Sequence, residues 1–148
     1  MDWWHRVAAS REPDFVIGQK YPYLRRWWLI PRNRFFNIYL HQFLLSDDDR
    51  ALHDHMYMNL SYILEGSYVE HTIAQGGVNH QKRYVAGCLR FRMPSTAHRI
   101  EIERPCWSLF ITGPRVREWG FHCPKGWRSW REFVDDRDYG KVGRGCED

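Results

Sequence analysis

Apolar and polar residues alternate in many short runs along the chain, and turn-forming residues separate the runs. A period of two is the pattern of strands that bury one face and expose the other. Runs that recur about every ten residues predict a sandwich, a barrel or a jelly roll. Strand patterns do not alternate with helical ones, which disfavours a parallel α/β sheet. The runs that we predict as strands are 23–31, 35–45, 58–66, 67–73, 83–93, 97–103, 106–112 and 117–123.

Turn residues pair several neighbouring runs into predicted hairpins. Runs 23–31 and 35–45 flank a Pro-Arg-Asn-Arg turn, and runs 58–66 and 67–73 meet at a Glu-Gly pair. Gly87 interrupts a later run and predicts a turn or a bulge. The fold class that follows is all-β, an antiparallel sandwich, barrel or jelly roll.

Length and composition are those of a single β domain. The chain has 148 residues, which fit one domain over 1–148, and it holds eight each of Trp, Tyr and Phe, which favour strands. We predict an N-terminal arm over 1–20, a β-barrel over 21–123, and a C-terminal helix and tail over 124–148. The spacing of the aromatic residues over 126–136 predicts that the helix is short.

The basic residues are mostly arginines, and the formal net charge is +4. They are scattered apart from a weak cluster of Arg25, Arg26, Arg32 and Arg34, so a nucleic-acid partner is disfavoured. An arginine-lined pocket for a small anion explains the same excess. A small-molecule partner is therefore the better expectation.

The four cysteines form no C-x-x-C pair. Neither a zinc ribbon nor a disulfide framework is predicted, and Cys88, Cys106 and Cys123 are expected to be small buried apolar residues. The first residues hold no apolar signal segment, and no apolar run approaches the roughly 20 residues of a membrane span. We therefore expect a soluble cytoplasmic protein with reduced thiols and no membrane partner.

Two histidines stand at the start of the run that leads to the Glu-Gly pair. His53 and His55 are two residues apart and so share one face of a strand, which Tyr57 continues. If the chain turns at the Glu-Gly pair, Ser61 lies opposite Glu70, and Glu70 faces the same way as the histidines. A slip of one residue would turn Glu70 outward.

A third histidine begins another amphipathic strand. His98 shares its face with Ile100 and Ile102, and alone it could be a core histidine or a ligand. Together with His53 and His55 it makes three imidazoles, the commonest neutral metal ligands. Three such ligands leave open positions on an iron, zinc or similar ion.

The segments HDHMYMNLSYILEG and GCLRFRMPSTAHR resemble the two signature motifs of the cupin superfamily. His53, His55 and Gly66 match the first motif, and Gly87 and His98 match the spacing of the second. The match covers about residues 45–112. The resemblance implies a cupin-type jelly roll, the double-stranded β-helix barrel, with His53, His55 and His98 as metal ligands.

The chain departs from the first motif at one position. The motif's glutamate falls at Asn59, whose amide is a poor ligand for most transition metals. A three-histidine site, as in the thiol dioxygenases and some dicarbonyl-cleaving cupins, needs no carboxylate. Alternatively, Glu70 supplies one as a fourth ligand or acts as an acid/base. A degenerate cupin without metal is the third reading.

Cupins hold substrates in the barrel mouth above the metal, which suggests further candidates. Tyr57 and Tyr68 face inward by the same count and could donate a phenol proton to a substrate, or they could be core aromatics. Arg90 and Arg92 alternate with apolar residues. Their basic face would bind a carboxylate or phosphate if it points inward, and would be ordinary surface if it points outward.

The segment 113–127 is dense in arginine, aromatic and turn residues. It could close the barrel mouth as a lid, with Arg117 or His122 reaching the site. The alternative is that its aromatic residues only plug the end of the barrel.

The function that the resemblance implies is a metal-binding cupin. The leading reading is a non-haem Fe(II) oxygenase that acts on a small substrate, for which an anion is a candidate. Zn, Ni and Mn are the alternative ions. The second reading is a metal-dependent isomerase or lyase on a sugar or keto acid, and the third is a non-catalytic small-molecule-binding cupin. The aromatic runs 23–31 and 35–45 are expected to form free edges that a homodimer covers.

Overall fold

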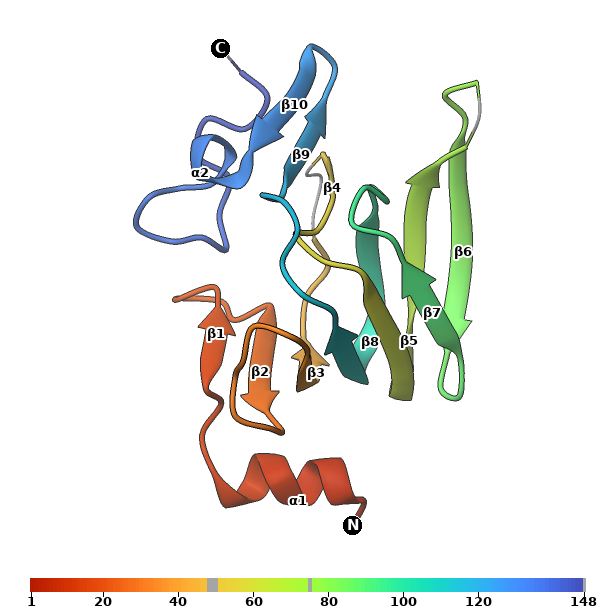
Figure 1. Cartoon of the computed structure of the whole chain (residues 1–148). Coiled ribbons are helices and arrows are strands. Elements are labelled where there is room, and N and C mark those ends of the chain that lie inside the picture. Colours follow the sequence, from red (N-terminus) through yellow and green to blue (C-terminus); the bar gives the residue numbers. More distant parts are fainter. Residues whose placement is uncertain (48–50, 75, 148) are drawn as a thin grey trace.

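The computed structural model describes residues 1–47, 51–74 and 76–147, and most of these residues lie in or between antiparallel strands (Figure 1). The segment 46–50 is polar in sequence and reads as a loop, and its residues 48–50 lie outside the described residues. The elements are α1 (Trp3–Ser10), β1 (Phe15–Ile17), β2 (Leu24–Trp28), β3 (Asn37–Phe43), β4 (Leu52–His53), β5 (Asn59–Ile73), β6 (Asn79–Val85), β7 (Leu89–Arg92), β8 (Arg99–Thr112), β9 (Gly120–Cys123), β10 (Gly126–Ser129) and α2 (Trp130–Phe133).

The strands form two sheets. Within the described ranges, the larger sheet has seven strands in the order β1-β2-β3-β8-β5-β6, with β7 also paired to β5, and the smaller has the order β10-β9-β4. Every pairing is antiparallel. In Figure 1, α1 lies below the first strands, and β9, β10 and α2 lie at the other end. The prediction of an all-β antiparallel jelly roll with a short C-terminal helix is confirmed.

The first predicted hairpin is present. β2 and β3 pair from Leu24↔Phe43 to Trp28↔Tyr39, and Arg26 lies opposite His41. The turn between them is stabilised by Asn33, whose Oδ1 accepts hydrogen bonds from the backbone N–H groups of the two residues that precede β3. Proline and asparagine favour turns, so the observed turn agrees with the prediction from the sequence.

The second predicted hairpin is wrong. β5 runs without a turn through the Glu-Gly pair, and β8 likewise runs through Pro105. Gly66 has a φ of +84°, and a Cβ there would lie 2.5 Å from the Pro105 carbonyl oxygen. The pairing of the two strands shifts register at this point. Gly66 and Pro105 face each other on neighbouring strands. They produce a bulge within β5 and β8, where the sequence pattern predicts that each strand ends.

The interior is filled by three clusters of apolar side chains. One lies inside the barrel and one beside the C-terminal helix. The third is covered by α1, because Trp4, Val7 and Ala8 recur at helical spacing and pack on it. The buried members of the three clusters are Ile63, Tyr68, Tyr84, Ile100 and Cys106; Phe121, Phe133 and Val134; and Trp27, Leu40 and Trp107.

The C-terminal part differs from its prediction in two ways. Residues 126–129 form β10, and the helix α2 is limited to Trp130–Phe133. The expectation of reduced thiols is also wrong for one pair, since Cys123 and Cys146 form a disulfide. Spacing alone could not pair these cysteines, because the tail folds back only after α2. Cys88 and Cys106 are free, and Cys106 is buried as expected.

Removing the disulfide should loosen the C-terminal segment. We expect Cys146→Ser to lower the free energy of unfolding by about 2–4 kcal/mol, because the unfolded chain regains the entropy that a cross-link removes. Urea denaturation without reductant measures it, and Cys88→Ser, at a free half-buried thiol, is the matched control. An unchanged wild-type curve after full reduction would contradict the bond's contribution.

The basis for the predicted homodimer does not hold. β3 lies between β2 and β8, and β1 covers the outer side of β2. Among the described strands, the ends of the larger sheet are β1 and β6, not the two aromatic runs. Homodimerisation therefore stays a prediction without the support of a free β2–β3 edge. Among the described residues, no helix is long and apolar enough to cross a membrane.

Candidate metal centre

Two of the three histidines are joined through their backbones. The N–H of His53 donates to the carbonyl of His98 at 2.9 Å, and the N–H of His98 donates to the carbonyl of His53 at 2.8 Å. They form an isolated antiparallel bridge. Directly opposed residues of such a pair place their side chains on the same side. The link between the end of β4 and the start of β8 therefore brings both imidazoles together.

His55 joins the pair by strand alternation. It lies two residues after His53, and its N–H donates to the carbonyl of Pro94 at 3.0 Å. The residues before His98 form the turn that carries this carbonyl. The sequence reading that the two histidines share one face is therefore in agreement with the backbone contacts.

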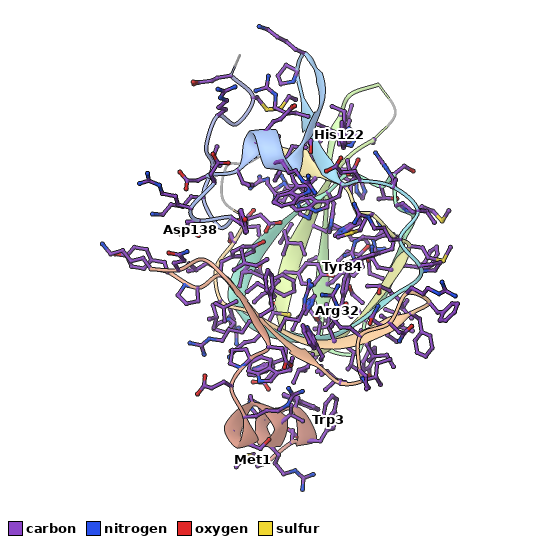
Figure 2. The ribbon with its side chains drawn as sticks, turned by 60° about the vertical axis from the view of Figure 1, so that its left-hand side comes forward. Met1, Trp3, Arg32, Tyr84, His122 and Asp138 are labelled. Carbon is purple, nitrogen blue, oxygen red and sulfur yellow. A yellow bond between two sulfur atoms is a disulfide. The ribbon has the colours of Figure 1, made fainter. Side chains whose placement is uncertain are left out.

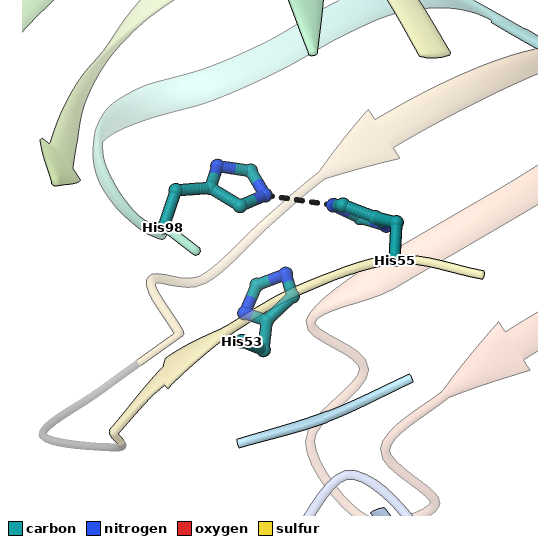
Figure 3. Close-up of side chains that lie close together, drawn as sticks. All are labelled: His53, His55 and His98. Carbon is teal, nitrogen blue, oxygen red and sulfur yellow. Dashed lines mark hydrogen bonds between the residues drawn. The ribbon is translucent and has the colours of Figure 1, made fainter. Parts of the chain in front are cut away.

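The three rings converge (Figure 3). Their centroids are 4.6 Å apart for His53 and His98, 5.0 Å for His55 and His98, and 5.2 Å for His53 and His55. One ring nitrogen from each lies within 4.8 Å of the other two. The Nε2 atoms of His55 and His98 are 2.8 Å apart.

This donor set fits a divalent ion. Nitrogens bind such an ion at about 2.0–2.1 Å, so two of them at about 90–110° lie about 2.8–3.4 Å apart, a range that includes the spacing of His55 and His98. Burial lowers the pKa of His55 well below its ordinary value, with the neighbouring histidines adding to the effect. Burial also lowers the pKa of His98, to about 3. Both rings are therefore neutral, as ligands must be.

Carboxylates lie behind two of the rings. The Nδ1 of His98 is 2.8 Å from Oε1 of Glu70, and the Nδ1 of His53 is 3.8 Å from Oδ2 of Asp47. Asp47 also accepts the backbone N–H of Ile100 at 2.8 Å. A carboxylate that is hydrogen-bonded to Nδ1, as Glu70 is to His98, fixes the tautomer and orients Nε2 toward an ion. Sequence reasoning missed Asp47, because it begins an acidic run typical of a polar loop.

Glu70 is buried and fully engaged. Its Oε1 accepts from Arg92 Nε at 2.5 Å as well as from His98, and its Oε2 accepts from Arg90 Nε at 2.7 Å. Burial opposes ionisation, but the hydrogen bond from His98 and the charge of Arg92 outweigh it and hold the pKa of Glu70 far below its ordinary value. Glu70 points inward as expected, but its neighbours across the sheet are Lys82 and Ile100 and not Ser61.

Asn59 stands at the position where the cupin motif has a glutamate, and Arg92 lies beside it on β7. The Arg92 side chain is 1% exposed. It donates to Asn59 Oδ1 at 3.3 Å, to Ser61 Oγ at 3.0 Å and to the hydroxyl of Tyr68 at 3.1 Å. Asn59 thus supports a buried arginine, and its amide does not belong to the histidine cluster.

The basic face of β7 points inward, and Leu89 and Phe91 are the exposed residues. Of the two open readings, the outer one is wrong for Arg92. The three arginines predicted to bind substrate are all paired within the chain: Arg90 and Arg92 with Glu70, and Arg117 with Asp54 at 3.1 Å.

Asp54 lies between His53 and His55 in the sequence and faces away from them. It is fully buried, and it accepts from Gly120 N at 2.9 Å and from Trp127 Nε1 at 3.0 Å. The Nε2 of His122 lies 3.0 Å from its Oδ2. The segment 113–127 therefore attaches to the back of the histidine strand, and neither Arg117 nor His122 is among the residues of the histidine cluster. Strand alternation would have indicated the outward direction of Asp54, but not its partners.

A cavity of about 450 Å³ opens beside the triad. Tyr57 and Tyr68 both line it, as the sequence predicts for inward-facing residues. Tyr57 stacks on His55 at 6.2 Å between centroids, whereas Tyr68 is buried against Arg92. Side chains from both ends of the chain also line the cavity, including Phe15 from β1 and Tyr139 from the C-terminal segment. Figure 2 shows the side chains that crowd the interior between the strands.

Comparison with solved structures places this fold. No family model and no curated protein matches the chain. It is similar to Bacillus subtilis oxalate decarboxylase with its Mn(II) centres, at 17% identity and a TM-score of 0.54, over 76% of this chain and 30% of that one. It is also similar to a Klebsiella pneumoniae protein with a double-stranded β-helix domain, at 12% identity and a TM-score of 0.53, over 72% and 90%.

A protein from Neisseria meningitidis is similar at 18% identity and a TM-score of 0.51, over 76% of this chain and 97% of that one. These identities show the fold alone. The chain spans less than a third of the length of oxalate decarboxylase, so that enzyme's activity is not carried over. The chain therefore has the double-stranded β-helix fold that the two motifs predict, and it carries a histidine cluster that could hold a metal ion.

Proposed function

We propose that this cupin is a metal-dependent enzyme that binds one divalent ion through His53, His55 and His98, with Fe(II) as the preferred ion. The observation that carries the proposal is the convergence of three buried or half-buried imidazoles at the wall of a cavity. An ion held by three ligands retains positions for a substrate and for oxygen. Zn, Ni and Mn are the competing ions, and the Mn(II) centres of oxalate decarboxylase support Mn among them.

The chain's own residues would orient the ligands and shape the cavity. Glu70 holds the Nδ1 proton of His98, which leaves Nε2 as the donor to the ion. Tyr57 contacts His55 from the cavity side. Burial raises the pKa of Tyr57, so its phenol keeps its proton and can donate a hydrogen bond to a substrate.

The state of Glu70 favours oxygenase over isomerase chemistry. An isomerase or lyase needs a group that gives and takes a proton near neutral pH. Glu70 is the carboxylate that could do so in the sequence-based reading, but both its oxygens are engaged and its charge is compensated by Arg90 and Arg92. We therefore propose that Glu70 positions His98 and that the protein is a non-haem Fe(II) oxygenase.

Oxygen consumption separates the candidate functions. Protein loaded anaerobically with Fe(II), Mn(II) or Zn(II) is mixed with a panel of small anionic substrates in an oxygen electrode. The oxygenase proposal expects uptake only with the redox-active ions and only when substrate is present. Substrate conversion under nitrogen would instead favour the isomerase or lyase. Tight binding without conversion under either gas would favour a non-catalytic binding cupin.

A single carboxylate substitution tests the role of Glu70. We expect Glu70→Gln to lower metal affinity about 10–100-fold, the range for lost outer partners of ligand histidines, because His98 loses its anionic acceptor. Competition with a chelator measures it. Glu101→Gln is a matched control, because Glu101 accepts from His71 in the same manner but is half exposed. Equal affinities for the two variants would remove Glu70 from the site.

Two further expectations stay predictions. Homodimerisation has no support from the β2–β3 edge. A cytoplasmic location is in tension with the Cys123–Cys146 pair, because stable disulfides are rare in reducing compartments.

A further inference from the structure

Three cations line the cavity beside the triad: Arg26, Arg32 and Arg92. Arg92 is neutralised by Glu70. Arg26 and Arg32 make no ion pair with any group in the described part of the chain. The one carboxylate among the described lining residues is Asp47, which binds the backbone of Ile100 near His53. Positive charge is therefore uncompensated at this part of the cavity wall.

Arg26 is held in place by neutral partners. Its Nε donates to Nε2 of His41, directly opposite on β3, at 2.8 Å. Its guanidinium carbon lies 4.6 Å from the centroid of the Tyr39 ring. These contacts leave the charge of Arg26 intact while they limit the freedom of its side chain. A preorganised guanidinium is well suited to a planar anion such as a carboxylate.

His41 presents a second donor. It is 3% exposed, and because its Nε2 accepts from Arg26, the neutral ring carries its proton on Nδ1. Burial lowers the pKa of His41 well below its ordinary value, with the charge of Arg26 adding to the effect, so the ring is neutral. No hydrogen-bond partner for Nδ1 exists among the described residues. A buried donor without an acceptor is costly, and such a group indicates a missing partner.

The Arg26–His41 pair lies one side chain from the triad. The ring of Phe110 stacks on His41 at 4.7 Å and packs against His55 at 6.1 Å. The rest of the cavity is mostly apolar. Its apolar lining includes Phe15, Ile17, Leu24, Trp28, Phe43 and Trp119. A cavity of this size and character buries a small molecule with an apolar body.

We propose that the substrate is an amphipathic carboxylate, whose anionic group binds the Arg26–His41 pair, with Arg32 nearby, and whose apolar body lies along the aromatic wall toward the histidine triad. That the carboxylate is converted at the triad rests on the proposed function, whereas its binding at Arg26 and His41 does not. The proposal also moves the anion site from Arg90, Arg92 and Arg117, which are already paired, to the β2–β3 hairpin. The balance of apolar lining and a single constrained arginine favours a carboxylate over a phosphate.

Titration calorimetry with 3-phenylpropionate, its neutral amide and inorganic phosphate tests the inference, on protein with and without Fe(II). We expect the carboxylate to bind both forms, and Arg26→Gln to weaken its binding roughly 10–100-fold, the value of a lost charge-assisted hydrogen bond. Arg25→Gln is the matched control: Arg25 is the exposed neighbour on the same strand. Arg26→Lys should recover part of the affinity.

Each outcome bears on the proposal separately from the metal site. Unchanged binding of the amide by Arg26→Gln shows that the cavity is intact. Metal content unchanged in the same variant shows that a loss of carboxylate binding is not a loss of the ion. The proposal is overturned if the carboxylate binds only when metal is present and regardless of Arg26. It is also overturned if Arg25→Gln weakens binding equally, or if phosphate binds as tightly as the carboxylate.

Discussion

Replacing His98 with alanine is expected to weaken metal binding by more than about 100-fold, beyond the effect of losing an outer partner. One of three donors disappears, and the remaining two come from a single short segment. His53→Ala and His55→Ala should act alike. Metal analysis after anaerobic loading with Fe(II), followed by chelator competition, measures the change. His80→Ala is the control, because His80 is an exposed histidine of β6.

A second cluster of side chains offers an alternative location for the ion. Asp2, His5 and Glu65 form the other described cluster that could hold one, and only His5 of the three is half-buried. If a variant without the three triad histidines retained its metal and His5→Ala lost it, the proposed function would fail. The binding of a carboxylate at Arg26 could still stand, since it does not require the ion.

Replacing Arg92 with methionine is expected to lower the free energy of unfolding by about 3–5 kcal/mol, the cost of leaving one member of a buried ion pair without its partner. Glu70 would remain ionised and buried, with only the half-exposed Arg90 beside it. Urea denaturation monitored by tryptophan fluorescence measures the change. Arg90→Met removes a cation from the same carboxylate nearer the surface and should cost clearly less.

The double variant Arg92→Met with Glu70→Gln tests the cause. If the uncompensated charge of Glu70 is the source of the destabilisation, removing that charge should restore part of the stability, so the double variant costs less than the sum of the single ones. Additive losses would instead mean that Arg92 acts mainly through Asn59, Ser61 and Tyr68.

Local sequence pattern was sufficient for several features. Alternation placed His53 and His55 on one face, and the motif spacing paired them with His98 across the barrel. The Pro/Asn turn correctly joined β2 to β3, which places Arg26 opposite His41. These features depend on the period of a strand or on a short turn, and the chain specifies both within a few residues.

The local sequence pattern could not decide whether the chain turns or only bulges at the Glu-Gly pair. A glycine with positive φ is compatible with a hairpin or with a bulge, and only the position of Pro105 on the neighbouring strand decides between them. The same limit applies to Cys123 and Cys146, which meet because the tail returns to β9.

The sequence by itself determined the β class of this protein, the cupin motifs and the three histidines that converge. The tertiary structure alone decided which charges are paired. Glu70 holds Arg90, Arg92 and His98, while Arg26 has no carboxylate partner in the described part of the chain. The physical reason is distance: an ion pair depends on side chains a few ångströms apart in space, contributed by strands that are remote in the sequence.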